Sequence, residues 1–229
     1  MKITWLGHSG FRIETGDTVL LIDPWLDGNP AFPADRRAEA TRGATHILVS
    51  HGHGDHASSA LAIAHETGAA IYCIHELSVA WGAEEGISVT GFGKGGTVAL
   101  GDARVTMVTA AHSSSLDASG LGVAGSEAGF MIAAEGHVIY FTGDTDIMAD
   151  MEWMADYHRP DIWLPSVGGH YTMDMDRAAY AAKRWFDFKL VIPCHWGTFP
   201  ILAQSCQPLI DALPGIDVRT PEVLKPIEV

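Results

Sequence analysis

The segment 50–56 carries three histidines and one aspartate within six residues, directly after the apolar run 46–49. These side chains are His51, His53, Asp55 and His56. An apolar run of this length is typical of a buried strand, so we place the cluster on the loop at the strand's end. Imidazole and carboxylate are ligands that zinc, manganese and iron accept, and the glycine spacers let side chains two apart converge. A solvated histidine-rich loop fits poorly, because the cluster is internal and a helical pattern follows it. The segment therefore predicts a metal site.

The length of 229 residues suits one large domain, and neither a linker nor an internal repeat is visible, so we predict a single domain over 1–229. With 47% hydrophobic and 18% charged residues, the chain is globular rather than disordered. A formal net charge of −14 argues against nucleic acid and anionic membranes as partners. We expect a small-molecule substrate, and an anionic one is compatible because bound divalent cations would offset the charge locally.

The N-terminus leads straight into a strand-like run, without a signal-peptide pattern or an apolar stretch of ~18–20 residues. Cys73, Cys194 and Cys206 are odd in number and widely spaced, which predicts reduced, buried thiols. We therefore expect a cytoplasmic protein. A homo-oligomer stays open, because Trp25, Trp81 and Trp153 fit an interface or a core equally well.

Strands and helices are interspersed along the chain. The predicted strands cover 3–6, 11–14, 18–22, 46–49, 70–74, 87–90, 97–100, 104–110, 130–134, 138–142, 162–165 and 189–193. The predicted helices cover 58–67, 76–83, 147–157, 174–186 and 201–213. Meanders of strands with helices between them predict an α/β or α+β class with mixed sheets. The long polar loop 25–43 is expected to cover the mouth of a site. Together with the loops 113–126 and 166–172, it is expected to set the specificity of the pocket.

Four polar clusters each lie just past the end of a predicted strand: the 51–56 segment, His112, Asp144 and His195. A lone histidine at a strand end is more often structural than a ligand, but binding loops gather at one edge of a sheet. Together the clusters supply five imidazoles and two carboxylates. One catalytic metal takes about three protein ligands and a water. The set therefore suits two metals ~3.5–4 Å apart, bridged by one carboxylate.

Three other sequence patterns do not indicate a functional site. The glycine-rich stretch 91–96 precedes a strand and not a helix, so it predicts a turn rather than a phosphate loop. The serines 113–115 lack the G-x-S-x-G elbow of a nucleophile. Cys194 neighbours His195 on a strand, so it is expected to face the core if His195 faces the metals.

The order His51-x-His53-x-Asp55-His56, His112, Asp144, His195 resembles the metallo-β-lactamase superfamily over nearly the whole chain. The flanking words WLGHS (5–9), LIDP (21–24), AHSS (111–114), TGDT (142–145) and GGHYTM (168–173) are similar to the UPF0173 group of small metal-dependent hydrolases. That group is akin to the ascorbate-6-phosphate lactonase branch. The resemblance implies a four-layer αββα sandwich with the site at the sheet edges.

The resemblance also implies residue roles. It gives His51, His53 and His112 to a first metal, Asp55, His56 and His195 to a second, and Asp144 to the bridge. Zinc is the first expectation for both ions, and manganese or iron suits the same ligands. A hydroxide between the metals would be the nucleophile, and the Asp55 carboxylate would orient it.

Three further side chains are candidates for supporting roles. Asp23 would fix a metal-bound imidazole or the cluster loop, unless it is only a turn former before Pro24. His170, in a glycine-flanked loop, would be a mobile catalytic acid or oxyanion donor. His8, in the first hairpin turn, is a candidate for the same role.

We expect a dinuclear metal hydrolase that cleaves a small ester, lactone or phosphodiester. A flavodiiron-like redox protein is disfavoured, because that group places Glu where His53 stands and carries a flavin domain. A nuclease is disfavoured by the charge of −14, and a glyoxalase-II-like thiolesterase by the absence of a C-terminal helical domain. A non-catalytic metal-binding or regulatory protein with the same ligands stays open.

Overall fold

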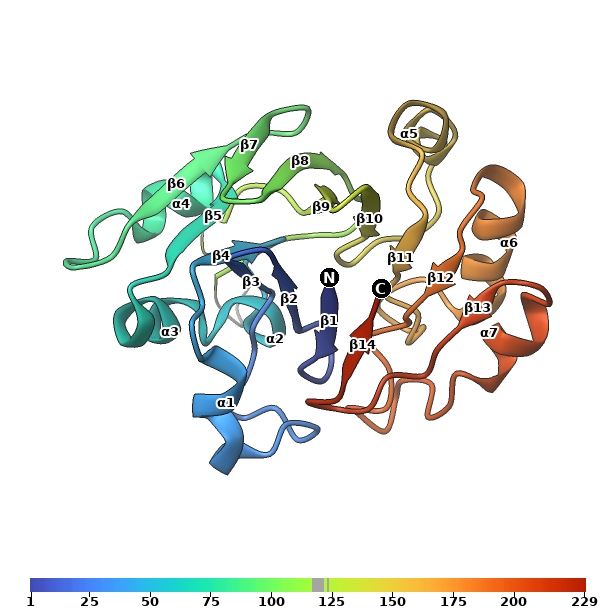
Figure 1. Ribbon diagram of the computed structural model, residues 1–229, viewed down its shortest axis with the longest axis horizontal. Helices are drawn as coiled ribbons and strands as arrows, with labels where there is room; N and C mark the ends of the chain where they lie inside the picture. The colour runs from blue at the N-terminus through green and yellow to red at the C-terminus, as the bar shows by residue number, and fades with distance from the viewer. Residues whose placement is uncertain (117–121, 123) are drawn as a thin grey trace.

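The computed structural model describes residues 1–116, 122 and 124–229, and within them two mixed seven-stranded sheets face each other (Figure 1). The first sheet has the strand order β14-β1-β2-β3-β4-β5-β6. Its strands are β1 (Lys2–Trp5), β2 (Phe11–Thr15), β3 (Thr18–Ile22), β4 (His46–Val49), β5 (Ala70–Ile74), β6 (Val89–Phe92) and β14 (Pro226–Glu228). Strands joined by tight turns pair antiparallel, whereas β3 to β6, which are joined by helical crossovers or long loops, pair parallel.

The second sheet has the order β13-β12-β11-β10-β9-β8-β7 and likewise consists of an antiparallel part and a parallel part. Its strands are β7 (Thr97–Leu100), β8 (Ala103–Thr109), β9 (Ala128–Ala134), β10 (His137–Phe141), β11 (Ile162–Leu164), β12 (Leu190–Val191) and β13 (Asp217–Val218). Strands β7 to β10 pair antiparallel, and β10 to β13 pair parallel. Since β8 and β10 both run antiparallel to β9, their carboxyl ends lie at one edge together with those of β11 and β12.

Helices cover the outer faces of both sheets, which confirms the four-layer αββα sandwich (Figure 1). Beside the first sheet lie the 3-10 turn η1 (Ala34–Arg36) and the helices α1 (Arg37–Thr41), α2 (Gly54–Ala57), α3 (Ala60–Thr67) and α4 (His75–Trp81). Beside the second sheet lie α5 (Asp150–His158), α6 (Met175–Trp185) and α7 (Gln207–Ala212). None of the helices described is long and apolar enough to cross a membrane.

Two apolar clusters stabilise these layers. The larger one fills the space between the sheets, where the rings of Phe11 and Phe141 meet edge to face with centroids 6.2 Å apart. The smaller one lies between the second sheet and α5 to α7, around the stacked rings of Trp163 and Phe188 at 4.8 Å. Each large apolar side chain buried in this way stabilises the fold by about 1.5–3 kcal/mol. The position of one sheet relative to the other is therefore set by side-chain packing.

Most predicted elements are confirmed within two residues, and the differences have local causes. The helix predicted over 201–213 begins only at Gln207, because Pro208 is tolerated only in the first turn of a helix. The helix predicted over 58–67 corresponds to α3, whereas the short helix α2, directly before it, was not predicted. The predicted turn 91–96 gives its first two residues to β6, where a Cβ on Gly91 would meet α4. Cys73, Cys194 and Cys206 are free and buried, as predicted.

Gly143 sits directly past β10 with φ +59°, and a Cβ there would clash with the backbone oxygen of Ala128. We expect Gly143→Ala to lower the free energy of unfolding by about 3 kcal/mol, because it adds a backbone clash to the strain of positive φ. Gly136, in the β9–β10 turn, is the matched control: its φ is +83° but nothing lies within 4 Å of the added Cβ. Gly136→Ala is expected to cost about 1 kcal/mol. Equal losses in urea denaturation would contradict the clash.

Candidate metal centre

The candidate ligands come from strand ends that share one edge of the sandwich. On the first sheet, β4 leads into His51 and His53, and the short helix α2 carries Asp55 and His56. On the second sheet, β8, β10 and β12 lead towards His112, Asp144 and His195 respectively. Because carboxyl ends of neighbouring strands meet at a common edge, seven side chains from distant parts of the sequence converge there.

One group of side chains consists of His51, His53 and His112, whose ligand atoms lie within 4.8 Å of one another. The Nε2 of His51 is 3.0 Å from the Nδ1 of His53. The ring of His112 stands edge-on to both other rings, with centroid distances of 5.2 Å. Three nitrogens are thus aimed at one small volume, which suits three ligands of a single cation.

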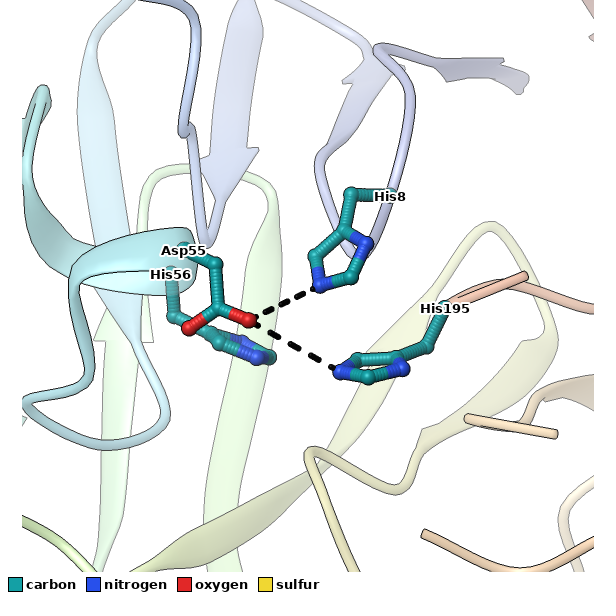
Figure 2. Close-up of side chains that lie close together, drawn as sticks. All are labelled: His8, Asp55, His56 and His195. Atoms are coloured by element: carbon teal, nitrogen blue, oxygen red, sulfur yellow. Dashed lines mark hydrogen bonds and ion pairs between the residues drawn. The ribbon is translucent and has the colours of Figure 1, made fainter. Parts of the chain in front are cut away.

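A second group consists of His8, Asp55, His56 and His195, also with ligand atoms within 4.8 Å of one another (Figure 2). Figure 2 shows the carboxylate of Asp55 facing the neighbouring rings of His8 and His195, whose Nε2 atoms lie 3.0 and 3.9 Å from its Oδ2. Unlike the other three residues, His8 comes from the β1–β2 turn, and it was expected only in a supporting role.

Asp144 lies between the two groups. Its Oδ2 is 3.0 Å from the Nε2 of His195 and 3.3 Å from that of His56, in the second group. It is also 3.6 Å from the Nε2 of His112, in the first group. One carboxylate thus contacts both groups, as a bridging ligand would.

Buried polar atoms in this cluster lack hydrogen-bond partners. Among the described side chains, the atoms without one include Nε2 of His56, Oδ1 of Asp144 and both ring nitrogens of His195. Native proteins rarely leave such atoms unsatisfied, so the set calls for a partner from outside the chain. Divalent cations accept these nitrogen and oxygen donors, and the residues therefore fit a metal.

Asp23 orients the rings of His51 and His56 through hydrogen bonds to their Nδ1 side, directly for His56 and through Ser50 for His51. Its Oδ2 accepts a hydrogen bond from Nδ1 of His56 at 2.7 Å and another from the hydroxyl of Ser50. The Ser50 hydroxyl in turn accepts from Nδ1 of His51 at 2.9 Å. Because both Nδ1 atoms carry the proton, both Nε2 lone pairs are turned towards the cluster. The structure thus places Asp23 where the sequence predicted an orienting acceptor, rather than in a turn alone.

The electrostatics of the cluster favour a positive charge at its centre. Burial lowers the pKa of His51 well below its usual value, and it lowers those of His53 and His112 as well, so these rings are neutral ligands. Burial also opposes charge on His56, but the carboxylates of Asp144 and Asp23 raise its pKa well above the usual value. A proton on His56 therefore occupies part of the place that a cation would take.

The position of His8 depends on several contacts. Its Nε2 donates to Oδ2 of Asp55 at 3.0 Å, since a carboxylate can only accept, and its Nδ1 lies 2.9 Å from the hydroxyl of Thr198. Its backbone oxygen accepts from the amide of His195 at 2.9 Å. Burial lowers the pKa of His8 to about 4, so the ring is neutral at physiological pH. His8 therefore orients Asp55 and ties the turn to the His195 loop.

Three residues of the centre adopt backbone conformations that L-residues rarely take. The φ angles are +53° at His8, +44° at Asp23 and +58° at His195. Each such conformation costs about 1–3 kcal/mol and persists only where the surroundings fix it. At Gly168, a Cβ would clash with the backbone oxygen of His195, which explains a glycine beside this loop. Strained backbone at three converging side chains is typical of a functional site.

A cavity of about 590 Å³ opens above the cluster. Its floor is formed by the candidate ligands His53, Asp55, His112, Asp144 and His195. Its rim is formed by Ser113, Tyr171, Phe199 and Ile201. The sequence predicted rim residues in the loops 113–126 and 166–172, and Ser113 and Tyr171 belong to them; residues 117–121 and 123 lie outside the described part of the chain. Phe199 and Ile201 were missed, although they follow His195 at the same strand end.

Two predictions about the mouth find less support. The loop 25–43 contributes no residue to the described lining; Trp25 only stacks behind Phe199, with centroids 5.8 Å apart. The segment packs instead beside the β1–β2 turn, where Asn29 lies against Gly7. His170 is exposed and is not among the described lining residues, but its ring contacts Tyr171 at 4.5 Å. Cys194 joins the apolar core while His195 faces the cluster, as predicted.

We expect Asp23→Asn to weaken zinc binding about 10–100-fold, because the amide cannot accept from both Ser50 and His56 while keeping both rings oriented. The matched control is Asp161→Asn. Asp161 also accepts from a histidine, His137, at 2.8 Å and from a backbone amide, but its partners lie outside the cluster. Competition with a chromogenic chelator measures both affinities. An unchanged affinity in Asp23→Asn would contradict the orienting role.

Metal uptake by the apoprotein is expected to release a proton, because the raised pKa of His56 keeps that ring protonated near neutral pH. The cation displaces the proton, so affinity should rise with pH across the neutral range. His51, His53 and His112, with lowered pKa values, are already neutral there and add no dependence. Calorimetry in buffers of different ionisation enthalpy counts the proton. Identical affinity at pH 6 and pH 8 would contradict this prediction.

Comparison with known proteins agrees with this geometry. The family described as Beta-lactamase superfamily domain matches residues 2–195. UPF0173 metal-dependent hydrolases of Dinoroseobacter shibae and Cereibacter sphaeroides are each 62% identical to this chain, and the matches cover 100% of both chains. The metallo hydrolase Igni18 from the hyperthermophilic archaeon Ignicoccus hospitalis superposes with a TM-score of 0.85 and 29% identity, over 99% of this chain and 97% of that one. Kinship with the ascorbate-6-phosphate lactonase branch stays a prediction. The chain belongs to the metallo-β-lactamase superfamily and, within it, to the UPF0173 group of metal-dependent hydrolases.

Proposed function

We propose that the chain cleaves a small ester, lactone or phosphodiester at a pair of divalent cations, most simply two zinc ions, with manganese or iron as alternatives. The first cation is assigned to His51, His53 and His112, the second to Asp55, His56 and His195, and the bridge to Asp144. The observation that carries the proposal is the contact of one buried carboxylate, Asp144, with histidines of both groups. A site for a single cation would use only one of these two groups of candidate ligands.

When bound, the two cations would supply a water of lowered pKa and would polarise the oxygen of the scissile group. The chain supplies the orientation. Asp144 is almost completely buried, and His195 and His56 keep its pKa well below the usual value despite that burial, so it is a permanent carboxylate. Protons would therefore not compete with the two cations for this carboxylate.

Asp55 has a separate task in this proposal. Burial disfavours its charge, but His56 and the hydrogen bond from His8 keep its pKa well below the usual value. A carboxylate of such low basicity accepts hydrogen bonds and does not retain a proton. With its Oδ2 turned towards His8 and His195, Asp55 can orient the attacking water relative to a substrate in the cavity.

We assign proton donation to the leaving group to His170. Its exposed ring touches Tyr171, which lines the mouth, and its backbone has φ +57°. A change of side-chain rotamer or of the glycine-flanked loop would be needed to bring the imidazole over the cavity. We also propose a cytoplasmic site of action on small molecules, which the odd number and wide spacing of the three cysteines support.

Metal content by elemental mass spectrometry tests the proposal on protein purified without chelator. We expect about two equivalents per chain in the wild type and about one in His112→Ala and in His195→Ala. Asp144→Ala should lower both occupancies and reduce hydrolysis at least about 10³-fold, because it removes the bridge. His137→Ala, which changes a histidine bound to Asp161 away from the cluster, is the control and should keep two equivalents.

Two outcomes would contradict the assignments. Full occupancy of both cations in Asp144→Ala would refute the bridge. No uptake of zinc, manganese or iron by the wild type on titration would refute the hydrolytic mechanism altogether.

A further inference from the structure

We propose that the substrate presents to this site, apart from its reacting group, an uncharged apolar or aromatic body that lies against Tyr171, Phe199 and Ile201. These three side chains are called the apolar rim below. The proposal rests on the proposed function, and it adds the class of substrate that the cavity selects.

The apolar rim exposes large hydrophobic surface beside the candidate metal ligands. Tyr171 is 57% exposed and Ile201 is 55% exposed, and both line the cavity of about 590 Å³. Exposed apolar side chains that border a concave site with polar groups at its floor are typical of ligand contact. Since the polar floor is made of candidate ligands, the apolar rim is left for the part of the substrate that does not react.

The apolar rim is preformed on its Phe199 side. The ring of Phe199 stacks on Trp25 at 5.8 Å and meets the ring of His8 edge-on at 5.5 Å. Its backbone oxygen accepts from the amide of Leu202 at 3.0 Å, which closes the turn that carries Ile201. Because little ordering is needed when a ligand arrives, contact area on this wall converts efficiently into affinity.

Among its described residues, the cavity offers an anionic body no basic side chain apart from the candidate metal ligands His53, His112 and His195. No lysine or arginine is among the described lining residues. In the sequence, the four segments that carry the lining residues, 43–93, 105–158, 160–176 and 190–218, contain neither residue. A charged group on the substrate body would therefore be desolvated without a partner, in a protein with a net charge of −14.

A positive charge on the body of the substrate would likewise find no free carboxylate among the described lining residues. The carboxylates in this described lining are those of Asp55 and Asp144, and both contact the candidate ligand His195. The remaining rim contacts are apolar, apart from the hydroxyls of Ser113 and Tyr171. The cavity thus selects against charge of either sign on the body, while the cations would neutralise charge only on the reacting group.

Ligand-observed NMR with zinc-loaded protein tests this selection through binding alone. Three probes share one ring: benzamide is neutral, 4-carbamoylbenzoate is anionic and 4-(aminomethyl)benzamide is cationic. We expect benzamide to bind about tenfold or more tightly than either charged probe, because each charge loses its hydration without compensation. Equal or tighter binding of a charged probe would overturn the proposal.

Two variants locate the contact. Tyr171→Ala should weaken benzamide binding several-fold, whereas Tyr157→Ala, which removes an exposed tyrosine outside the cavity, should not. Ile201→Arg should raise the affinity for 4-carbamoylbenzoate about tenfold, because it supplies the missing cation at the rim. Val79→Arg places the same charge on an exposed position of α4 and controls for the overall field. Wild-type benzamide affinity in Tyr171→Ala would overturn the proposal.

A hydrolysis panel separates this proposal from the function on which it rests. Phenyl esters, aryl lactones and phenyl phosphodiesters are each tested with an unsubstituted ring and with a ring that carries a carboxylate. Hydrolysis with the carboxylate-bearing member favoured would overturn the apolar selection and keep the proposed hydrolase. No hydrolysis in any class, with the expected order of probe binding, would refute the proposed chemistry and support the apolar pocket.

Discussion

The carboxylate of Asp144 is the group on which the geometry of the centre depends. It is 2% exposed, and its Oδ2 lies 3.0 Å from His195 and 3.3 Å from His56. A buried charge of this kind is stable only when opposite charges or hydrogen bonds surround it. The surrounding histidines come from both sheets, so this carboxylate is surrounded only where apolar packing brings the edges of the two sheets together. Gly143 allows the chain to turn directly before it, and Asp23 supports the histidines that face it.

The centre is divided between the two sheets. The loops of the first sheet supply His51, His53, Asp55 and His56, and those of the second supply His112, Asp144 and His195. Neither sheet alone supplies all members of the first group or all members of the second group. The distances between the candidate ligands therefore depend on the apolar packing between the sheets, for example at Phe11 and Phe141. The geometry of the candidate site thus depends on the packing of the apolar core.

Much of the site could be predicted, because its residues follow apolar strands and carry rare ligand chemistry in a specific order. Asp23 could be proposed for the same reason, since it ends a strand. Ser50, Thr198 and Phe199 could not, because a serine, a threonine or a phenylalanine acquires a role only through the partner that the fold brings to it. Sequence spacing also says nothing of direction: the loop 25–43 was expected above the mouth, but it packs beside the β1–β2 turn. The helix α7 begins at Gln207 because Pro208 is accepted only in its first turn. The prediction from apolar periodicity did not take this local signal into account.

The division of the ligands between the sheets has a consequence for the lifetime of the chain. A cation bound by side chains of both sheets would act as a reversible cross-link between two halves that otherwise share an apolar interface and a few hydrogen bonds, such as that from the amide of His195 to the backbone oxygen of His8. Since such an ion binds the folded chain and not the dispersed ligands of the unfolded one, free metal at about a hundred times its dissociation constant would add about 2.7 kcal/mol to folding stability. The abundance of the protein would then follow the metal supply of the cell, and a shortage would appear first as turnover of the polypeptide rather than as an intact, idle enzyme.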